Sequence, residues 1–84
     1  MKIDKYGTKG IMKITNKYGD IVYKNYIGEL HRTDGPAIEY DNGMKRWYIN
    51  DTLIFDIYHD GSHRRFRDIP LEMKQSIAME LLKV

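Results

Sequence analysis

The sequence predicts an α+β fold, mainly β: an antiparallel meander of about six short strands, with one C-terminal amphipathic helix packed on a sheet face. Three observations predict it. Alternating polar and apolar residues flank Asn42-Gly43, the strongest short-range signal of a β-hairpin. A related pattern recurs 24 residues upstream, around residues 14–19, which is typical of repeated hairpins. The segment 68–84 instead follows a helical period.

Length and composition predict one domain, residues 1–84, with the hairpin meander in 1–67 and the helix in 68–84. The chain is 42% hydrophobic and 31% charged, which is ordinary for a globular protein. The absence of cysteine excludes disulfides and thiolate metal sites. No apolar run approaches the roughly 18 residues of a membrane span, and the N-terminus has no apolar signal-peptide region. We therefore expect a cytoplasmic protein with no membrane partner.

The first hairpin pairs residues 11–16 with residues 20–27 through a loop over 17–19. The loop length leaves two registers open, in which Met12 and Ile14 share a face either with Ile21 and Tyr23 or with Val22 and Tyr26.

The central hairpin can be paired by treating Asn42-Gly43 as a two-residue turn. This register places Glu39 opposite Arg46, as a cross-strand ion pair worth about 0.2–1 kcal/mol. Alternation then predicts a second, apolar face that carries Ile38, Tyr40, Trp47 and Ile49.

A turn at Asp51-Thr52 is expected to lead into the last hairpin, whose strands are 53–58 and 62–67. The same two-residue rule at Asp60-Gly61 predicts two cross-strand pairs, Asp56 with Arg65 and Phe55 with Phe66.

The C-terminal helix is predicted from Asp68, a residue suited to cap a helix, and from Pro70 in the first turn. About half of the helical wheel is apolar and carries Leu71, Met73, Ile77, Ala78, Leu81, Leu82 and Val84. We expect this side to cover a sheet face; docking on another chain is the alternative.

The segment from His31 to Asn50 resembles hairpin repeats found in proteins of bacteriophages and large DNA viruses, which are similar to variant MORN repeats. The matching residues are His31, Arg32, Asp34, Gly35, Pro36, Ala37, Tyr40, Asn42, Gly43, Trp47, Tyr48 and Asn50. Where the repeat pattern has Gly after Asn50, this chain has Asp51. The resemblance implies a small viral protein whose hairpins act as an interaction scaffold, with no catalytic residues to carry over.

Charge is uneven along the chain and predicts the kind of partner. Residues 1–24 hold six Lys against two Asp, whereas residues 25–62 hold seven acids against three basic residues. We therefore expect a non-enzymatic protein-binding module, a phage inhibitor of a host defence protein, with an acidic and aromatic sheet surface that mimics nucleic acid. The residues proposed for this surface are Glu29, Asp34, Glu39, Asp41, Asp51, Tyr23, Tyr26 and Tyr48.

Two alternatives remain open. One is nucleic-acid binding through the basic ends, with candidate residues Arg64, Arg67, Lys13 and Lys24. The other is a self-assembling structural component, a homo-oligomer. No catalytic, cofactor or metal site is predicted, and His31 is expected to hydrogen-bond Asp34 within its turn.

Overall fold

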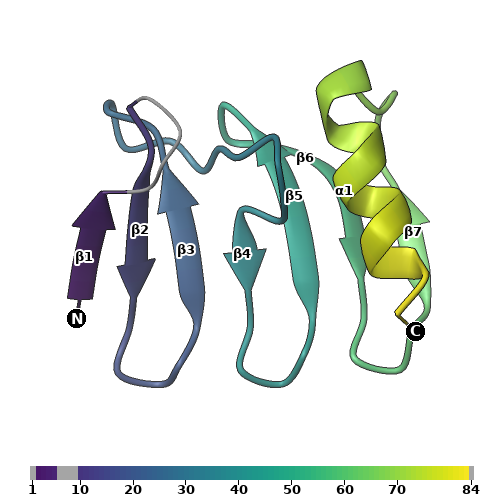
Figure 1. Ribbon diagram of the computed structural model, residues 1–84, viewed down its shortest axis with the longest axis horizontal. Coiled ribbons are helices and arrows are strands. Elements are labelled where there is room, and N and C mark those ends of the chain that lie inside the picture. The colour runs from purple at the N-terminus through teal and green to yellow at the C-terminus, as the bar shows by residue number, and fades with distance from the viewer. Residues whose placement is uncertain (1, 6–9, 84) are drawn as a thin grey trace.

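A computed structural model describes residues 2–5 and 10–83. They form one antiparallel sheet and one helix (Figure 1). The elements are β1 (Lys2–Lys5), β2 (Met12–Thr15), β3 (Ile21–Lys24), β4 (Ile38–Glu39), β5 (Lys45–Ile49), β6 (Thr52–Ile57), β7 (His63–Arg65) and α1 (Leu71–Leu81). The seven strands lie in the sheet in sequence order, so the sheet is a meander. The predicted fold class is confirmed, and β1 is the strand that the sequence did not indicate.

Three hairpins end in the same three-residue loop, and these loops lie side by side at one end of the sheet (Figure 1). In the β4–β5 loop, Gly43 N–H donates to Tyr40 O at 3.0 Å, and Tyr40 N–H donates to Met44 O at 2.8 Å. Gly43 has φ 95°, the left-handed conformation that follows a type I turn in a loop of this length. Equivalent bonds close the loops at Gly19 and Gly61, so all three hairpins turn in one way.

This loop type shows that the predicted registers of the central and last hairpins are wrong by one residue. Ile38 lies opposite Arg46, so the predicted Glu39–Arg46 pair does not form. In the last hairpin Asp56 lies opposite Arg64 instead of Arg65, and Phe55 lies opposite Arg65 instead of Phe66. Because side chains alternate along a strand, a shift by one residue moves every partner to the other face.

The predicted apolar face of the central hairpin is therefore divided between the two sides of the sheet. Ile38 is on one side with Arg46, whereas Trp47 lies opposite Phe55 on the other side. In the first hairpin, where two registers were open, Ile14 lies opposite Val22.

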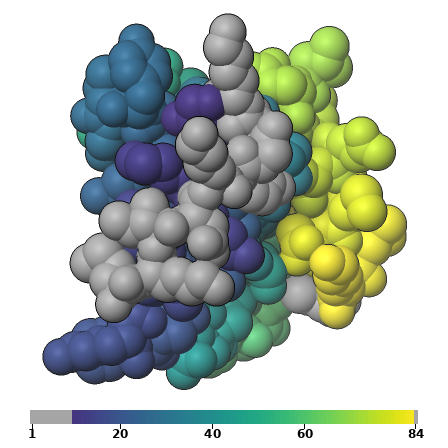
Figure 2. Space-filling model, turned by 60° about the vertical axis from the view of Figure 1, so that its left-hand side comes forward, coloured from purple at the N-terminus to yellow at the C-terminus, as the bar shows by residue number. Residues whose placement is uncertain are grey.

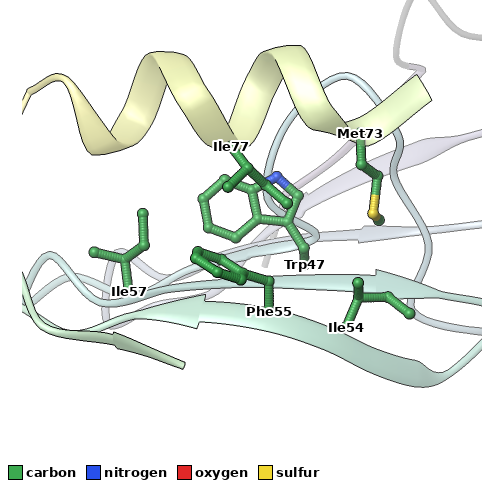
Figure 3. Packing of buried hydrophobic residues seen from close by; sticks show 6 residues of the cluster. All are labelled: Trp47, Ile54, Phe55, Ile57, Met73 and Ile77. Atoms are coloured by element: carbon green, nitrogen blue, oxygen red, sulfur yellow. The ribbon is translucent and has the colours of Figure 1, made fainter. Parts of the chain in front are cut away.

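The hydrophobic core lies between α1 and strands β5 and β6 (Figure 3). Its buried members are Trp47, Ile54, Phe55, Ile57, Met73 and Ile77. The Trp47 and Phe55 rings meet edge to face, with centroids 5.8 Å apart. The Trp47 indole N–H donates to Ser76 Oγ at 3.0 Å, so the single tryptophan joins the sheet to the helix by packing and by a hydrogen bond.

The helix covers one face of the sheet, as predicted, and in Figure 2 its residues all lie to one side of the strands. It is shorter than expected, since it spans Leu71–Leu81 and the sequence predicted a helix over residues 68–84. No side chain caps its N-terminus. Asp68 instead accepts a hydrogen bond from Arg65 Nη1 at 3.2 Å. The buried stripe is Met73 and Ile77, while Leu71 is 81% exposed. The predicted apolar arc is therefore only partly used.

The segment between β3 and β4 is held by the Arg32 side chain. The Arg32 guanidinium donates to Asp34 Oδ1 at 2.9 Å and to the carbonyl oxygen of Pro36 at 3.1 Å. It also lies over the Tyr23 ring, 4.0 Å from the centroid. The predicted His31–Asp34 bond is wrong, since His31 Nδ1 accepts from the Asn50 backbone N–H at 3.1 Å. Arg32 and its partners Asp34, Pro36 and Tyr23 therefore hold the segment between β3 and β4 in place; we call them the arginine clamp.

Candidate binding surface

The two faces of the sheet differ in what lies over them. Trp47 and Phe55 face α1, and their chain neighbours Arg46 and Asp56 point to the opposite side because strand residues alternate. All described strands belong to one sheet and the single described helix lies on the other face, so neither a strand nor a helix of residues 2–5 and 10–83 lies over this side. We call it the open face; its residues are Met12, Ile14, Val22, Lys24, Ile38, Tyr40, Arg46, Tyr48, Asp56, Tyr58, Arg64 and Phe66.

One row of paired residues crosses the open face from β2 to β7. Its first half is apolar and runs through Ile14, Val22 and Ile38. Its second half is ionic and runs through Arg46, Asp56 and Arg64. Ile14 and Val22 are partly exposed and Ile38 is buried, so the accessible apolar residues of the row lie on β2 and β3.

Asp56 is the centre of the ionic half and is fully buried. Arg64 holds it with two hydrogen bonds, Nη2 to Oδ2 at 2.9 Å and Nε to Oδ1 at 3.3 Å. These bonds raise the pKa of Arg64 above its ordinary value. Arg46 Nε lies 3.8 Å from Asp56 Oδ2, and it is enclosed with no hydrogen-bond partner among the described residues. One carboxylate therefore faces two guanidinium groups, and the cluster keeps a net positive charge.

Aromatic rings surround the two arginines. The Arg64 guanidinium carbon lies 4.8 Å from the centroids of both Tyr58 and Phe66. The Arg46 guanidinium carbon lies 5.7 Å from the Tyr40 centroid. Such cation–π contacts hold the arginine side chains over the sheet. The result is a fixed basic and aromatic surface, in which the only carboxylate among the open-face residues lies beneath the arginines.

The acidic residues proposed from the sequence are not gathered on one surface. Asp41 lies in the β4–β5 loop and Asp51 in the β5–β6 turn, at opposite ends of β5. Asp34 and Glu39 both face Arg32, with Glu39 Oε2 at 3.5 Å from its Nη1. Glu29 accepts a hydrogen bond from the Asn25 side chain at 2.9 Å. Asp51 accepts a hydrogen bond from the Leu30 N–H. Four of the five acidic residues, all except Asp41, thus stabilise loops or contact Arg32, and none of the five belongs to the open face.

The three proposed tyrosines have different environments. Tyr23 is only 3% exposed, under Arg32, so its assignment as a surface anchor is wrong. Tyr26 is 83% exposed, at the tip of a loop that Gly28 closes. Tyr48 is half-buried on the open face. The rings that do surround the open-face arginines, Tyr40, Tyr58 and Phe66, were not proposed, and only the correct register would have shown them together.

The basic residues proposed for the alternative function are also divided. Arg64 and Lys24 belong to the open face. Lys13 lies opposite Tyr23 and therefore on the helix side of the sheet. Arg67 is exposed in the connection between β7 and α1.

The described residues offer little for a small ligand. One shallow pocket, of about 200 Å³, is lined by Lys45 and Glu80 among others and lies against the helix. This volume is below the roughly 300–1,000 Å³ of typical ligand sites. Within residues 10–83 no three His, Asp or Glu side chains are grouped as metal ligands would be. None of the helical residues described forms a stretch long and apolar enough to cross a membrane.

Comparison with known proteins adds no relative. No protein-family model matches the chain, and neither the curated proteins nor the solved structures include a significant match.

Proposed function

We propose that this chain is a non-enzymatic protein-binding module whose open face is the docking surface. The observation that carries the proposal is the basic and aromatic cluster around Asp56, since tyrosine and arginine are the residues enriched at the centres of protein interfaces. The apolar half of the row adds a patch next to it through Ile14 and Val22, which are partly exposed, whereas Ile38 is buried.

The charge of the open face indicates the chemistry of the partner. Lys24, Arg46 and Arg64 are basic, and the one carboxylate is buried between the arginines. An acidic surface on the partner would complement this face and speed association. The proposed partner surface is thus acidic, which differs from the basic groove that an acidic nucleic-acid mimic would occupy.

The biological setting is part of the same proposal and is supported by the sequence resemblance. The segment around His31–Asn50 resembles phage and viral hairpin repeats, so we place the protein in an infected host cell, in its cytoplasm. Its partner would then be a host protein, and inhibition of a defence component is the effect we propose.

The test compares capture of a partner by four purified forms of the protein: the native chain and three single variants. We expect the native chain to retain a host protein that Tyr58→Ser and Phe66→Ser lose, because these changes remove open-face rings. Leu71→Ser is the matched control, since Leu71 is equally apolar but exposed on the helix. Capture that is insensitive to both open-face variants would contradict the proposal, and so would capture lost only with Leu71→Ser.

The same surface favours a second candidate function, binding of single-stranded nucleic acid. Arginines stacked on tyrosine and phenylalanine offer flat groups on which bases can stack. Fluorescence anisotropy with a labelled single-stranded oligonucleotide tests it. We expect affinity that falls steeply with salt if this function holds; a flat salt dependence or no binding at low salt would exclude it.

A further inference from the structure

The last strand, β7, is an edge strand with hydrogen-bonding groups directed away from the sheet. Tyr58 N–H donates to Ser62 O at 2.7 Å, and Phe66 N–H donates to Ile54 O at 2.8 Å. In an antiparallel pair the backbone groups of alternate residues point to the partner strand. Ser62, Arg64 and Phe66 therefore bond to β6, and the N–H and C=O groups of His63 and Arg65 point outward. Among the strands formed by residues 2–5 and 10–83, β7 is the last in the sheet and β6 is its one neighbour (Figure 1).

Charge decides which strand this edge can accept. β7 and the residues after it carry Arg64, Arg65 and Arg67, together with His63. Asp68 is the acid that follows them, and it is fully exposed in its pair with Arg65. A second copy that paired through its own β7 would place arginines opposite arginines, and like charges directly opposite each other destabilise a strand pair. An acidic strand would instead place carboxylates beside Arg65 and Arg67.

We propose that β7 accepts an extended acidic segment of a partner protein as an eighth strand of the sheet. This inference rests on the proposed function, because it names how the protein partner binds. The outward N–H and C=O groups of His63 and Arg65 supply main-chain hydrogen bonds, which is how strand addition gains affinity. The basic side chains supply selectivity, since they oppose pairing with neutral or basic edges.

The two faces of the sheet define the sequence pattern of such a segment. On the helix side, its side chains would lie beside His63 and Arg65, where carboxylates are favoured. On the open face, they would lie beside Arg64, already bound to Asp56, and beside Phe66, which is 45% exposed. The expected segment therefore alternates acidic residues with apolar residues.

A designed peptide tests the pattern. The probe is a fluorescein-labelled eight-residue peptide of alternating Glu and Val, and the matched control is the same peptide with Lys in place of Glu. We expect the acidic peptide to bind at least ten times more tightly than the basic one. Equal binding of the two peptides, or none by either, would overturn the proposal.

A backbone variant separates strand addition from simple charge attraction. Arg65→Pro removes an N–H that points outward and leaves the bonds to β6 intact, so we expect at least a tenfold loss of peptide affinity. Arg65→Ala is the control that removes the charge and keeps the N–H, and it should lose less. Circular dichroism checks that Arg65→Pro stays folded. If it does not, hydrogen exchange of the native chain replaces it, with new protection of the His63 and Arg65 amides on peptide addition as the expected result.

The outcomes also distinguish this inference from the proposed function. Protection confined to residues such as Tyr40 and Tyr48 would leave the open face as a docking surface and overturn strand addition at β7. Peptide binding that depends on Arg65, together with partner capture insensitive to both Tyr58→Ser and Phe66→Ser, would support the β7 site and contradict the open-face proposal. Protection of the β7 amides without any peptide, in a protein that scatters light as a dimer, would show that a second copy occupies the edge.

Discussion

The Arg32 guanidinium carbon lies 4.0 Å from the centre of the Tyr23 ring, and this stack fixes the segment between β3 and β4 on the helix side of the sheet. The same guanidinium binds the Pro36 carbonyl oxygen, Asp34 and Glu39. The turn thus closes around its own arginine side chain. Arg32, Asp34 and Pro36, which belong to the motif that resembles hairpin repeats, thus hold the connection between β3 and β4 in place.

Gly35→Ala should destabilise the protein by about 1 kcal/mol, the usual contribution of a hydrogen bond, because the Arg32 guanidinium must move away from the Pro36 carbonyl oxygen and the Tyr23 ring to make room. A Cβ at residue 35 would overlap the Arg32 guanidinium, which lies directly beside the glycine. Urea unfolding followed by the fluorescence of Trp47 measures the effect. The control is the same change in an Arg32→Ala background, where it should cost much less; an equal cost in both backgrounds would show that the clash is not the cause.

Asp51 lies in the turn between β5 and β6, at a position where the backbone is left-handed. Asn50 and Asp51 have φ 45° and 65°, so both residues of the β5–β6 turn are left-handed. Left-handed backbone costs a residue with a Cβ about 1–2 kcal/mol. Asp51 Oδ1, however, accepts a hydrogen bond from the Leu30 N–H at 2.6 Å, which ties the turn to the segment before β4.

The Asp51 variants separate these two effects. Asp51→Gly relieves the backbone strain and loses the hydrogen bond, so we expect a net change within about 1 kcal/mol. Asp51→Ala keeps the strain and loses the bond, and should be about 1 kcal/mol less stable than Asp51→Gly. Thermal and urea unfolding provide the comparison. Equal stabilities for the Gly and Ala variants would mean that the left-handed turn carries no strain.

Asp56→Asn should lower the free energy of unfolding by about 1.5–3 kcal/mol, the range for hydrogen bonds to charged groups. The variant keeps the shape of the side chain but leaves Arg46 and Arg64 without their shared counter-charge. We place the expected value at the low end because both guanidinium groups are partly exposed. Asp68→Asn is the control, since its fully exposed pair with Arg65 should contribute nothing measurable. Equal losses in the two variants would contradict a special role for the buried carboxylate.

The fold class could be predicted because alternation and turn residues act locally. Val, Ile and Tyr alternate with polar residues, and a glycine lies in the loop of three hairpins, at positions 19, 43 and 61. The registers of the central and last hairpins could not be predicted from these local signals. An Asn-Gly or Asp-Gly pair suits a two-residue turn, and it equally suits the last two positions of a three-residue loop. The three-residue loop forms here, so Ile38 and Trp47 lie on opposite faces of the sheet instead of sharing one.

The candidate site depended on the registers of two strand pairs. The predicted two-residue turns place Glu39 opposite Arg46 and Arg65 opposite Asp56. In the structure Asp56 lies opposite Arg64, because the β6–β7 loop has three residues, and opposite Arg46, because of the register between β5 and β6. The clamp at Arg32 was beyond sequence reasoning for another reason: its partner Tyr23 is nine residues away, on a different element.

The helix should contribute to stability through its inner stripe alone. Ile77→Ala is expected to cost about 2–4 kcal/mol, because Ile77 packs against the Trp47 side of the sheet (Figure 3). Leu71→Ala should change stability by less than about 0.5 kcal/mol, since Leu71 is exposed. Urea unfolding of both variants gives the comparison. A large loss from Leu71→Ala would mean that the outer side of the helix packs on something in solution.

Acid should destabilise two hairpin loops, because it protonates the Asp60 and Asp20 carboxylates that accept hydrogen bonds there. The Asp60 carboxylate accepts hydrogen bonds from Ser62 Oγ at 2.7 Å and from Ser62 N–H at 3.0 Å, and these bonds hold its pKa below the usual 3.8. The Asp41 N–H, at 2.8 Å, and the Asn16 side chain lower the pKa of Asp20 in the same way. A carboxyl whose pKa is lower in the folded state stabilises the fold above its unfolded pKa.

The stabilisation from Asp60 and Asp20 should therefore be complete above about pH 4 and be lost as the pH falls through their folded pKa values. Carboxyl carbon chemical shifts measured by NMR between pH 6 and 2 report each group separately. Ser62→Ala should return the Asp60 pKa toward 3.8, because the Ser62 side chain is the largest cause of its shift. Asp20 is the internal control and should titrate unchanged in that variant. An Asp60 that already titrates at its usual value in the native chain would show that the loop bonds do not form in solution.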